Sequence, residues 1–435
     1  MSYTQQHIIQ RQILEVQLAS RENHHPIAEE VTRIFEDQIS AQLEQLFDRF
    51  APADRMVSLD TLVLDLGQVS LQQLERDLPT LFLQAAEKEL QSSFQQNRSS
   101  QQQTEEPSLS IAPQQGKIIE ALFQYLRSGN LPWWIEVAHM ADFEEKVLPA
   151  LATASPSEWK QVLSRKPART RLAYQFGEAV FREVVAILQL TDSGISPYTL
   201  TTSTILQKAQ QGLSPVKREQ LLGQLIHGHT EGTELIAEQT AKKIPPANPS
   251  LSSTLEQPYH QAGTYNVKRN VHYVSYAGVV LLWPWLGQFF RKLGLMEGKQ
   301  FQDPAAQQKA IHLLAYLCTG REDVPEYECL LFKLLCDYPF EEVLLYPSAL
   351  TTKEKTASEA LLLALIQHWS KLQNTQPDSL RETFLQREGK LTHKQEGWQL
   401  QVEQEAYDIL LSQLPWSISA IKLSWMDEMV WVEWG

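Results

Sequence analysis

The stretch that decides the fold covers residues 353–435. It contains EALLLALIQHW from residue 359 and GWQLQV from residue 397. In the first segment Leu362 and Ile366 recur at helical spacing, which predicts an amphipathic helix. In the second segment Trp398 and Leu400 alternate with glutamines, which predicts a half-buried strand.

Further elements are predicted on both sides of this strand. They are a short helix over 378–389, a helix over 406–414, and strands over 418–425 and 429–434. Gly389 is expected to stop the short helix in the left-handed conformation, and Pro415 with Trp416 breaks the next one. Five of the 11 tryptophans lie within 398–434, and this much aromatic surface predicts a packed α+β unit at the chain end.

Three segments of this region resemble the carboxy-terminal block of the contractile injection system tape measure family. They are LRETFLQREGKL from residue 380, GWQLQVEQEAYDILLSQLPWSIS from residue 397 and WMDEMVWVEW from residue 425. Members of this family belong to phage-tail-like particles that drive an inner tube through a membrane by sheath contraction. The residues that carry this resemblance are Leu380, Arg381, Phe384, Arg387, Gly389, Pro415, Trp416, Trp425 and Trp434.

The amino-terminal region reads as strand, helix, strand and helix. Alternation predicts a strand over 9–18, and apolar residues at steps of three and four predict a long helix over 26–50. Leucines alternate again over 62–66, which predicts a strand ended by Gly67, and Ser70 with Gln73 forms a capping box for the next helix. The segment SLDTLVLDLG from residue 58 resembles the opening domain of the same family.

The middle of the chain contains ALFQYLRSGNLPWWIE from residue 121, which also resembles that family, as does RTRLAYQFGEAVFREVVAIL from residue 169. A helix is expected to stop near Gly129, and Pro132 followed by Trp133 and Trp134 forms a rigid aromatic corner. Core anchoring or a protein interface is favoured for these tryptophans over carbohydrate stacking.

Three helical segments are predicted before residue 353, over 273–296, 309–320 and 325–339, and all resemble the family's carboxy-terminal block. The first is apolar on nearly all sides, so it is expected to be buried. The segment YLCTG, ending at Gly320, matches YLRSG, ending at Gly129. An old duplication or two helices with the same glycine cap would explain the match, and the second interpretation is preferred.

Composition shifts divide the chain into domains and linkers. We predict an amino-terminal α+β domain over 1–90, a Gln/Ser-rich linker over 91–116, a helical middle region over 117–242, a Pro/Ser-rich linker over 243–264 and a carboxy-terminal helical domain with terminal strands over 265–435. The fold class is α+β and predominantly helical: a small strand–helix domain, a helical middle and a helical domain ending in a small tryptophan-rich sheet.

Charge and cysteine content narrow the partners and the compartment. The net charge of −14 argues against nucleic acid or an anionic membrane surface as the main partner. Three cysteines without metal-ligand spacing indicate reduced thiols in a cytoplasmic protein. No signal peptide is predicted, because the amino terminus lacks the basic and apolar regions of one. No membrane insertion is predicted, because the longest apolar run is too short to span a bilayer.

No catalytic motif is found, and no cofactor or metal is predicted. His227, His229 and Glu231 form the best metal candidate, but a polar loop is favoured because no third anchor lies nearby. Cys329 and Cys336 are expected to be core thiols. Solvated surfaces are predicted for two charged groups, the basic run over 160–171 and the acidic set Glu326, Glu328, Glu341 and Glu342.

The resemblance implies a non-enzymatic structural component that controls tube and sheath length during assembly. Inner tube, baseplate or cap subunits are the implied partners, and the implied location is the cytoplasm during assembly, or an assembled or released particle. A tube-end or baseplate assembly protein without ruler function is the alternative, and an unrecognised enzyme is the third interpretation. Interrupted helices and the absence of a sustained heptad repeat are in tension with an extended ruler.

Overall fold

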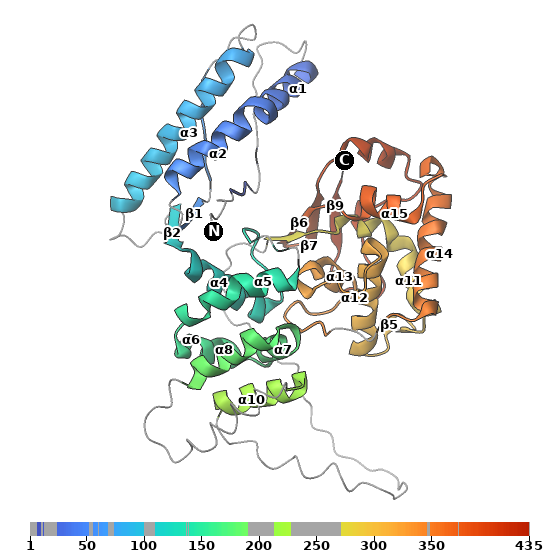
Figure 1. Cartoon of the computed structure of the whole chain (residues 1–435). Helices are drawn as coiled ribbons and strands as arrows, with labels where there is room; N and C mark the ends of the chain where they lie inside the picture. Colours follow the sequence, from blue (N-terminus) through green and yellow to red (C-terminus); the bar gives the residue numbers. More distant parts are fainter. Residues whose placement is uncertain are drawn as a thin grey trace, which may run out of the picture. The chain divides into compact units, whose positions relative to one another are not determined.

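Figure 1 shows the computed structural model of the chain. The residues that the structure describes are 7–9, 12, 24–51, 55–59, 61–67, 74–99, 109–135, 137, 139–189, 213–227, 271–345, 349–372 and 374–434. The chain divides into two compact units. The first comprises Met1–Leu122, Trp134–Glu136 and Glu145–Ala154, and the second comprises Phe123–Trp133, Val137–Glu144 and Ser155–Gly435.

The first unit is built on long helical segments. Helix α1 (His24–Ile34), the π-helical turn η1 (Phe35–Ile39) and helix α2 (Ser40–Phe50) follow one another without a break, and α3 (Leu74–Ser99) packs against them. This confirms the long helix predicted over 26–50. Apolar residues at steps of three to five form the core, because that spacing keeps them on one helical face. They include Val31, Ile34, Ile39, Leu43 and Leu46, facing Leu78, Phe82, Ala86 and Leu90.

The strand predicted over 62–66 is wrong. The strand lies earlier, where β1 (Arg55–Leu59) pairs antiparallel with β2 (Leu109–Pro113). The alternation still describes the side chains, since Leu62, Leu64 and Leu66 pack partly buried against the core while Val63 is 75% exposed. Alternation fixes which side chains face inward, but a strand also needs a neighbour with free backbone groups.

The range 91–116, predicted as a linker, carries secondary structure at both ends. Helix α3 continues to Ser99, β2 covers Leu109–Pro113 and α4 (Gln114–Ser128) begins directly after it. Glutamine is a good helix former, so a glutamine-rich segment extends a helix that is already anchored by buried leucines. The Ser70–Gln73 capping box and the linker over 243–264 lie outside the described residues, as does most of the predicted strand over 9–18. The domain boundaries stay a prediction.

Short helices make up the middle of the chain. They are α5 (Met140–Val147), the 3-10 helix η3 (Leu148–Thr153), α6 (Pro156–Leu163), α7 (Lys166–Gln175), α8 (Glu178–Gln189) and α10 (Pro215–His227). Within the second unit, α6, α7, α8 and α10 pack against one another (Figure 1). Helices α6 and α7 each have a proline in the first turn, where the missing N–H costs nothing.

A five-stranded mixed sheet closes the chain, in the order β3–β6–β7–β9–β8. Its strands are β3 (Val271–Val274), β6 (Gly389–Lys394), β7 (Gly397–Val402), β8 (Ala420–Ile421) and β9 (Val430–Glu433). Only β7 and β9 pair in parallel, and the 3-10 helix η10 (Ala406–Gln413) and β8 lie between them in sequence. Leu391, Leu400 and Val432 belong to the core, as the predicted alternation requires.

The helices of this region supply the rest of the core. They are η6 (Ala277–Leu282), α11 (Trp283–Lys292), α12 (Pro304–Thr319), η7 (Glu326–Glu328), α13 (Leu330–Leu335), α14 (Thr352–His368), η8 (Ser370–Leu372), α15 (Pro377–Leu380) and the π-helical η9 (Arg381–Leu385). A two-residue hairpin pair, β4 (Met296–Glu297) and β5 (Gln300–Phe301), separates α11 from α12. The predicted fold class, α+β and mostly helical, is confirmed.

Two local predictions in this region are wrong. Gly389 does not stop a helix; it begins β6, and η9 has already ended at Leu385. The helix predicted over 273–296 divides into β3, η6 and α11, and Pro284 lies in the first turn of α11. Periodicity does not distinguish a buried strand or 3-10 segment from a buried helix when nearly every residue is apolar.

Candidate functional site

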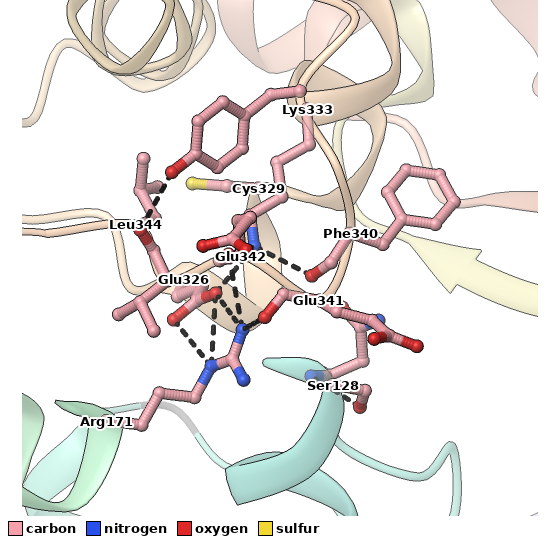
Figure 2. Close-up of polar contacts among 12 residues, drawn as sticks. Ser128, Arg171, Glu326, Cys329, Lys333, Phe340, Glu341, Glu342 and Leu344 are labelled. Carbon is pink, nitrogen blue, oxygen red and sulfur yellow. Dashed lines mark hydrogen bonds and ion pairs between the residues drawn. The ribbon is translucent and has the colours of Figure 1, made fainter. Parts of the chain in front are cut away.

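Three charged side chains with almost no access to solvent form the polar centre of the second unit. The side chain of Arg171 is 0% exposed, and those of Glu326 and Lys333 are each 1% exposed. Arg171 Nη2 donates to Glu326 Oε1 over 2.9 Å, and Lys333 Nζ donates to the same oxygen over 2.5 Å (Figure 2). We refer to Arg171, Glu326 and Lys333 as the buried charge cluster.

Three separate elements deliver these side chains. Arg171 lies on the buried face of α7, one turn after Pro167, while Glu326 opens η7 directly after Pro325. Lys333 lies inside α13, whose six residues LLFKLL are all buried. Arg171 and Glu326 are 155 positions apart in sequence. Tertiary folding alone therefore creates the pair.

Backbone carbonyl oxygens complete the shell around the two cations. They belong to Leu126, Phe340, Glu341 and Glu342. Arg171 donates to Leu126 O over 3.0 Å and to Glu341 O over 2.7 Å, and Lys333 donates to Glu342 O over 2.8 Å. Two cations share one carboxylate here, so the carbonyl dipoles take up the remaining positive charge.

Gln175 is the fourth polar side chain of the site. Its Nε2 atom donates to Glu326 Oε2 over 2.7 Å and to Leu344 O over 3.0 Å, while its Oε1 atom accepts from the Tyr125 hydroxyl over 2.7 Å. Both oxygens of the carboxylate are therefore bound, as a buried ion pair requires. Side chains from α7 and α13 therefore bind the backbone of residues 340–344.

The charges of the cluster shift one another's ionisation. Burial raises the pKa of Glu326, but the neighbouring Lys333 and Arg171 outweigh it, and the net shift is downward. Burial lowers the pKa of Lys333 by more than its pairing with Glu326 raises it. Both shifts are downward, which favours the charged form of Glu326 but disfavours that of Lys333, because Glu326 has two cationic neighbours, whereas Lys333 shares its single anion with Arg171.

This arrangement is suited to holding elements together and unsuited to catalysis. A buried carboxylate with a lowered pKa is a poor general acid, and the cluster has no exposed atom where a substrate could approach. The solvated surface predicted for the run over 160–171 is wrong at Arg171, and that predicted for the acidic set is wrong at Glu326. A helical face inside a basic run turns inward at Arg171 because a buried acid is there to neutralise it.

The sequence offered one overlooked signal for this site. Lys333 interrupts an apolar segment in which every neighbour from Leu330 to Leu335 is buried, and a lysine in such a position requires a partner. Nothing in the sequence identified that partner, because Glu326 has the same local pattern as the partly exposed Glu328.

The residues of the aromatic corner, Pro132, Trp133 and Trp134, follow the end of α4 in sequence. Helix α4 ends at Ser128 and Gly129 takes φ +77°, which confirms the predicted stop. An added Cβ at Gly129 would lie 2.4 Å from Glu326 Oε1 and 3.0 Å from an Arg171 nitrogen. Pro132 is buried and Trp133 is 40% exposed, whereas Trp134 is half-buried. Core anchoring is therefore not the role of Trp133.

A second buried arginine lies near Gly320. Arg381 donates from Nε to Leu317 O over 3.1 Å and pairs with Asp378 over 2.6 Å and with Glu359. Gly320 ends α12 with φ +70°, as predicted. Leu380 and Phe384 flank this arginine in sequence and are buried in the core.

The remaining residues that carry the resemblance anchor the sheet region. Arg387 donates to Asp408 over 2.9 Å, and the Trp434 indole donates to the same carboxylate over 3.1 Å. The indole of the buried Trp425 donates to Leu335 O over 2.8 Å. Pro415 is exposed, and the ring of Trp416 packs edge-on to Trp285 with centroids 4.6 Å apart.

Within the part of the chain that the structure describes, thiols and histidines supply no second site. Cys318, Cys329 and Cys336 are buried and unpaired, and burial raises the pKa of Cys329, which confirms the predicted core thiols. His227 ends α10, while His229 and Glu231 lie outside the described residues. Among the residues with described positions, no group of three potential metal ligands comes together, and no helix has the length and apolarity needed to cross a bilayer.

Comparison with protein-family models identifies a family for this chain. A family model described as contractile injection system tape measure protein matches residues 6–434, almost the whole chain. No curated protein and no solved structure gives a significant match.

Proposed function

The chain belongs to the contractile injection system tape measure protein family, and from this premise we propose how it performs the structural, non-enzymatic role in length control that the family implies. The second unit stays folded and acts at an end of the growing tube. In this proposal the length of the tube is not set by the length of an extended tape measure chain.

The observation that carries this proposal is the buried charge cluster. Arg171 of α7 is bound to Glu326, 155 residues later, with both side chains almost fully shielded from solvent. Drawing the chain out into a ruler would separate these charges. Leaving one charge of a buried pair without its partner costs about 3–5 kcal/mol, and the core of the second unit would also be exposed.

Helix lengths point the same way. A fully helical chain of 435 residues would extend to about 650 Å at ~1.5 Å per residue. Helix α3 has 26 residues and would span about 39 Å on the same scale. Prolines and left-handed glycines such as Gly129 and Gly320 end the helices of the second unit, so its sequence favours folded helices over one continuous rod.

The chain is a component of a contractile injection particle, and we propose which subunits it contacts directly. The net charge of −14 favours protein partners over nucleic acid, and we propose subunits of the inner tube, the baseplate or the cap. We place this contact in the cytoplasm during assembly. Purified particles, probed for the protein, test whether it remains in the assembled or released form.

Insertion mutagenesis tests the proposal. A helical cassette of about 40 residues between α10 and β3 would add roughly 60 Å to an extended ruler at ~1.5 Å per residue. We expect electron microscopy to show particles of unchanged length, because the contacts of the second unit are preserved. A Gly/Ser cassette of equal length at the same position is the control for the insertion itself.

A linear increase of particle length with cassette length would overturn the folded-end proposal and establish an extended ruler. Deletion of the gene distinguishes length control from the alternative, a tube-end or baseplate assembly role without ruler function. Particles of scattered length would support length control. Loss of particles, or particles that lack their cap, would indicate an end component without ruler function.

A further inference from the structure

Two stretches of the chain repeat one order of structural features, and the residues that carry the repeat all belong to the second unit. We call residues 124–175 the first helical motif and residues 315–386 the second helical motif. Each begins with the end of a helix, continues through a glycine turn to a helix with a capping box, and finishes in a helix that carries a buried arginine.

The opening turns are the same in their hydrogen bonds. Gly129 and Gly320 take φ +77° and +70°, and their N–H groups donate to Tyr125 O over 2.7 Å and to Tyr316 O over 2.8 Å. The hydroxyls of Ser128 and Thr319, each one residue before the glycine, donate to the carbonyl four residues earlier over 2.8 Å. Each hydroxyl also accepts from the N–H two residues later, over 3.2 Å and 3.0 Å respectively.

A later helix in each motif, α6 in the first and α14 in the second, starts with a reciprocal capping box. In the first motif Ser155 accepts from the Glu158 N–H over 3.3 Å, and its own N–H donates to the Glu158 carboxylate over 2.7 Å. In the second motif Thr351 and Glu354 make the same two bonds over 3.3 Å and 2.7 Å.

The last helical segment of each motif carries an arginine that binds the end of the first helix. In both motifs this arginine comes four residues after a proline in the first turn: Pro167 and Arg171 in α7, Pro377 and Arg381 in α15 and η9. Arg171 donates to Leu126 O over 3.0 Å, and Arg381 donates to Leu317 O over 3.1 Å. Leu126 and Leu317 occupy the same place, directly after the tyrosine of YLRSG and YLCTG.

We infer that the two motifs are copies of one structural unit. Glycine caps and capping boxes are common individually, so either could arise twice without kinship. A buried arginine at the same position of the last helical segment, which donates to the same carbonyl of the first helix, belongs to neither of these general motifs. The preference for two helices that merely share a glycine cap is therefore replaced by a duplication.

The copies differ in where the arginine finds its acid. Arg171 binds Glu326, which belongs to the second motif, whereas Arg381 binds Glu359 and Asp378 of its own motif. The first arginine is therefore both an internal cap and the joint between the copies. The second arginine is only an internal cap, because both of its acids lie within its own motif.

Hydrogen exchange of the full chain tests both parts of this inference. Arg171→Gln should lower the protection of the Gly129 amide and of the Glu342 amide by about tenfold or more, while the Gly320 amide is unchanged. Arg381→Gln should lower the protection of the Gly320 amide by a similar factor and leave those of Gly129 and Glu342 unchanged.

Matched variants keep the test decisive. Arg182→Gln, an exposed position on α8, should leave the amides of Gly129, Gly320 and Glu342 as they are. Arg171→Lys and Arg381→Lys retain the charge and should give the same pattern with smaller losses if a glutamine variant fails to fold. Unchanged protection of Gly320 in the Arg381 variants would overturn the equivalence of the copies, and unchanged protection of Glu342 in the Arg171 variants would overturn the joint.

Discussion

Arg171 and Arg381 make the same bond to the end of a helix, yet their acidic partners lie in different surroundings. The Glu326 side chain that binds Arg171 is 1% exposed. The side chains that bind Arg381 are more exposed, Glu359 at 36% and Asp378 at 85%. The difference shows that the energetic weight of an ion pair depends on the desolvation of the acid as well as on the geometry of the arginine.

The largest difference is expected when the acids are removed. Glu326→Ala leaves Arg171 and Lys333 buried without a counter-charge, and it should lower the free energy of unfolding by about 3–5 kcal/mol. Asp378→Ala leaves Arg381 paired with Glu359 and should cost no more than about 1 kcal/mol. Urea unfolding followed by tryptophan fluorescence measures both. Equal losses would show that burial does not separate the two arginines.

Alanine at the two turn glycines sharpens the comparison. Both substitutions force a side chain into the left-handed region, which costs about 1–2 kcal/mol. The added methyl of Gly320→Ala meets its nearest neighbour, Arg381, at 3.8 Å, so strain is its only cost. Gly129→Ala places the methyl 2.4 Å from Glu326 Oε1 and should cost more, because the buried charge cluster has to shift. Thermal unfolding of the two variants should therefore rank Gly129→Ala as the less stable, and the opposite order would contradict the described packing.

A smaller effect is expected from pH. The pKa of Glu326 in the folded protein lies below its ordinary value of 4.5. A lowered pKa means that the stabilisation is complete above the unfolded value and is lost as the pH falls from 4.5 through the folded pKa. Glu326→Gln removes this titration, so its unfolding free energy should fall less steeply below pH 4.5 than that of the parent, by at most about 1.4 kcal/mol per pH unit. Urea titrations between pH 3 and pH 6 would reveal parallel slopes if Glu326 did not contribute.

Local pattern was sufficient for the elements with one clearly apolar face. The spacing of leucines predicted α14, and the alternation of Trp398 with Leu400 predicted β7. Glycine chemistry predicted the ends of α4 and α12, because only a residue without Cβ enters the left-handed region cheaply. The family resemblance, which the match over residues 6–434 confirms, also came from the sequence.

The failures share one physical cause, the need for a partner elsewhere in the chain. Leu62, Leu64 and Leu66 alternate as a strand does, but β2 pairs with β1 and leaves them no ladder. Glycine commonly ends a helix, but Gly389 begins β6, which pairs with β3 and β7. An added Cβ at this position would lie 2.7 Å from Ala277 Cβ.

The sequence by itself determined the helical periods, the turn glycines and the family. Tertiary structure alone decided which charges are buried. Arg171 and Glu326 each sit in a polar segment that predicts a solvated surface, and they meet across 155 residues only after α7 and η7 have folded against each other. An isolated charge avoids the interior because desolvation is costly, so its burial depends on a counter-charge that local sequence does not contain.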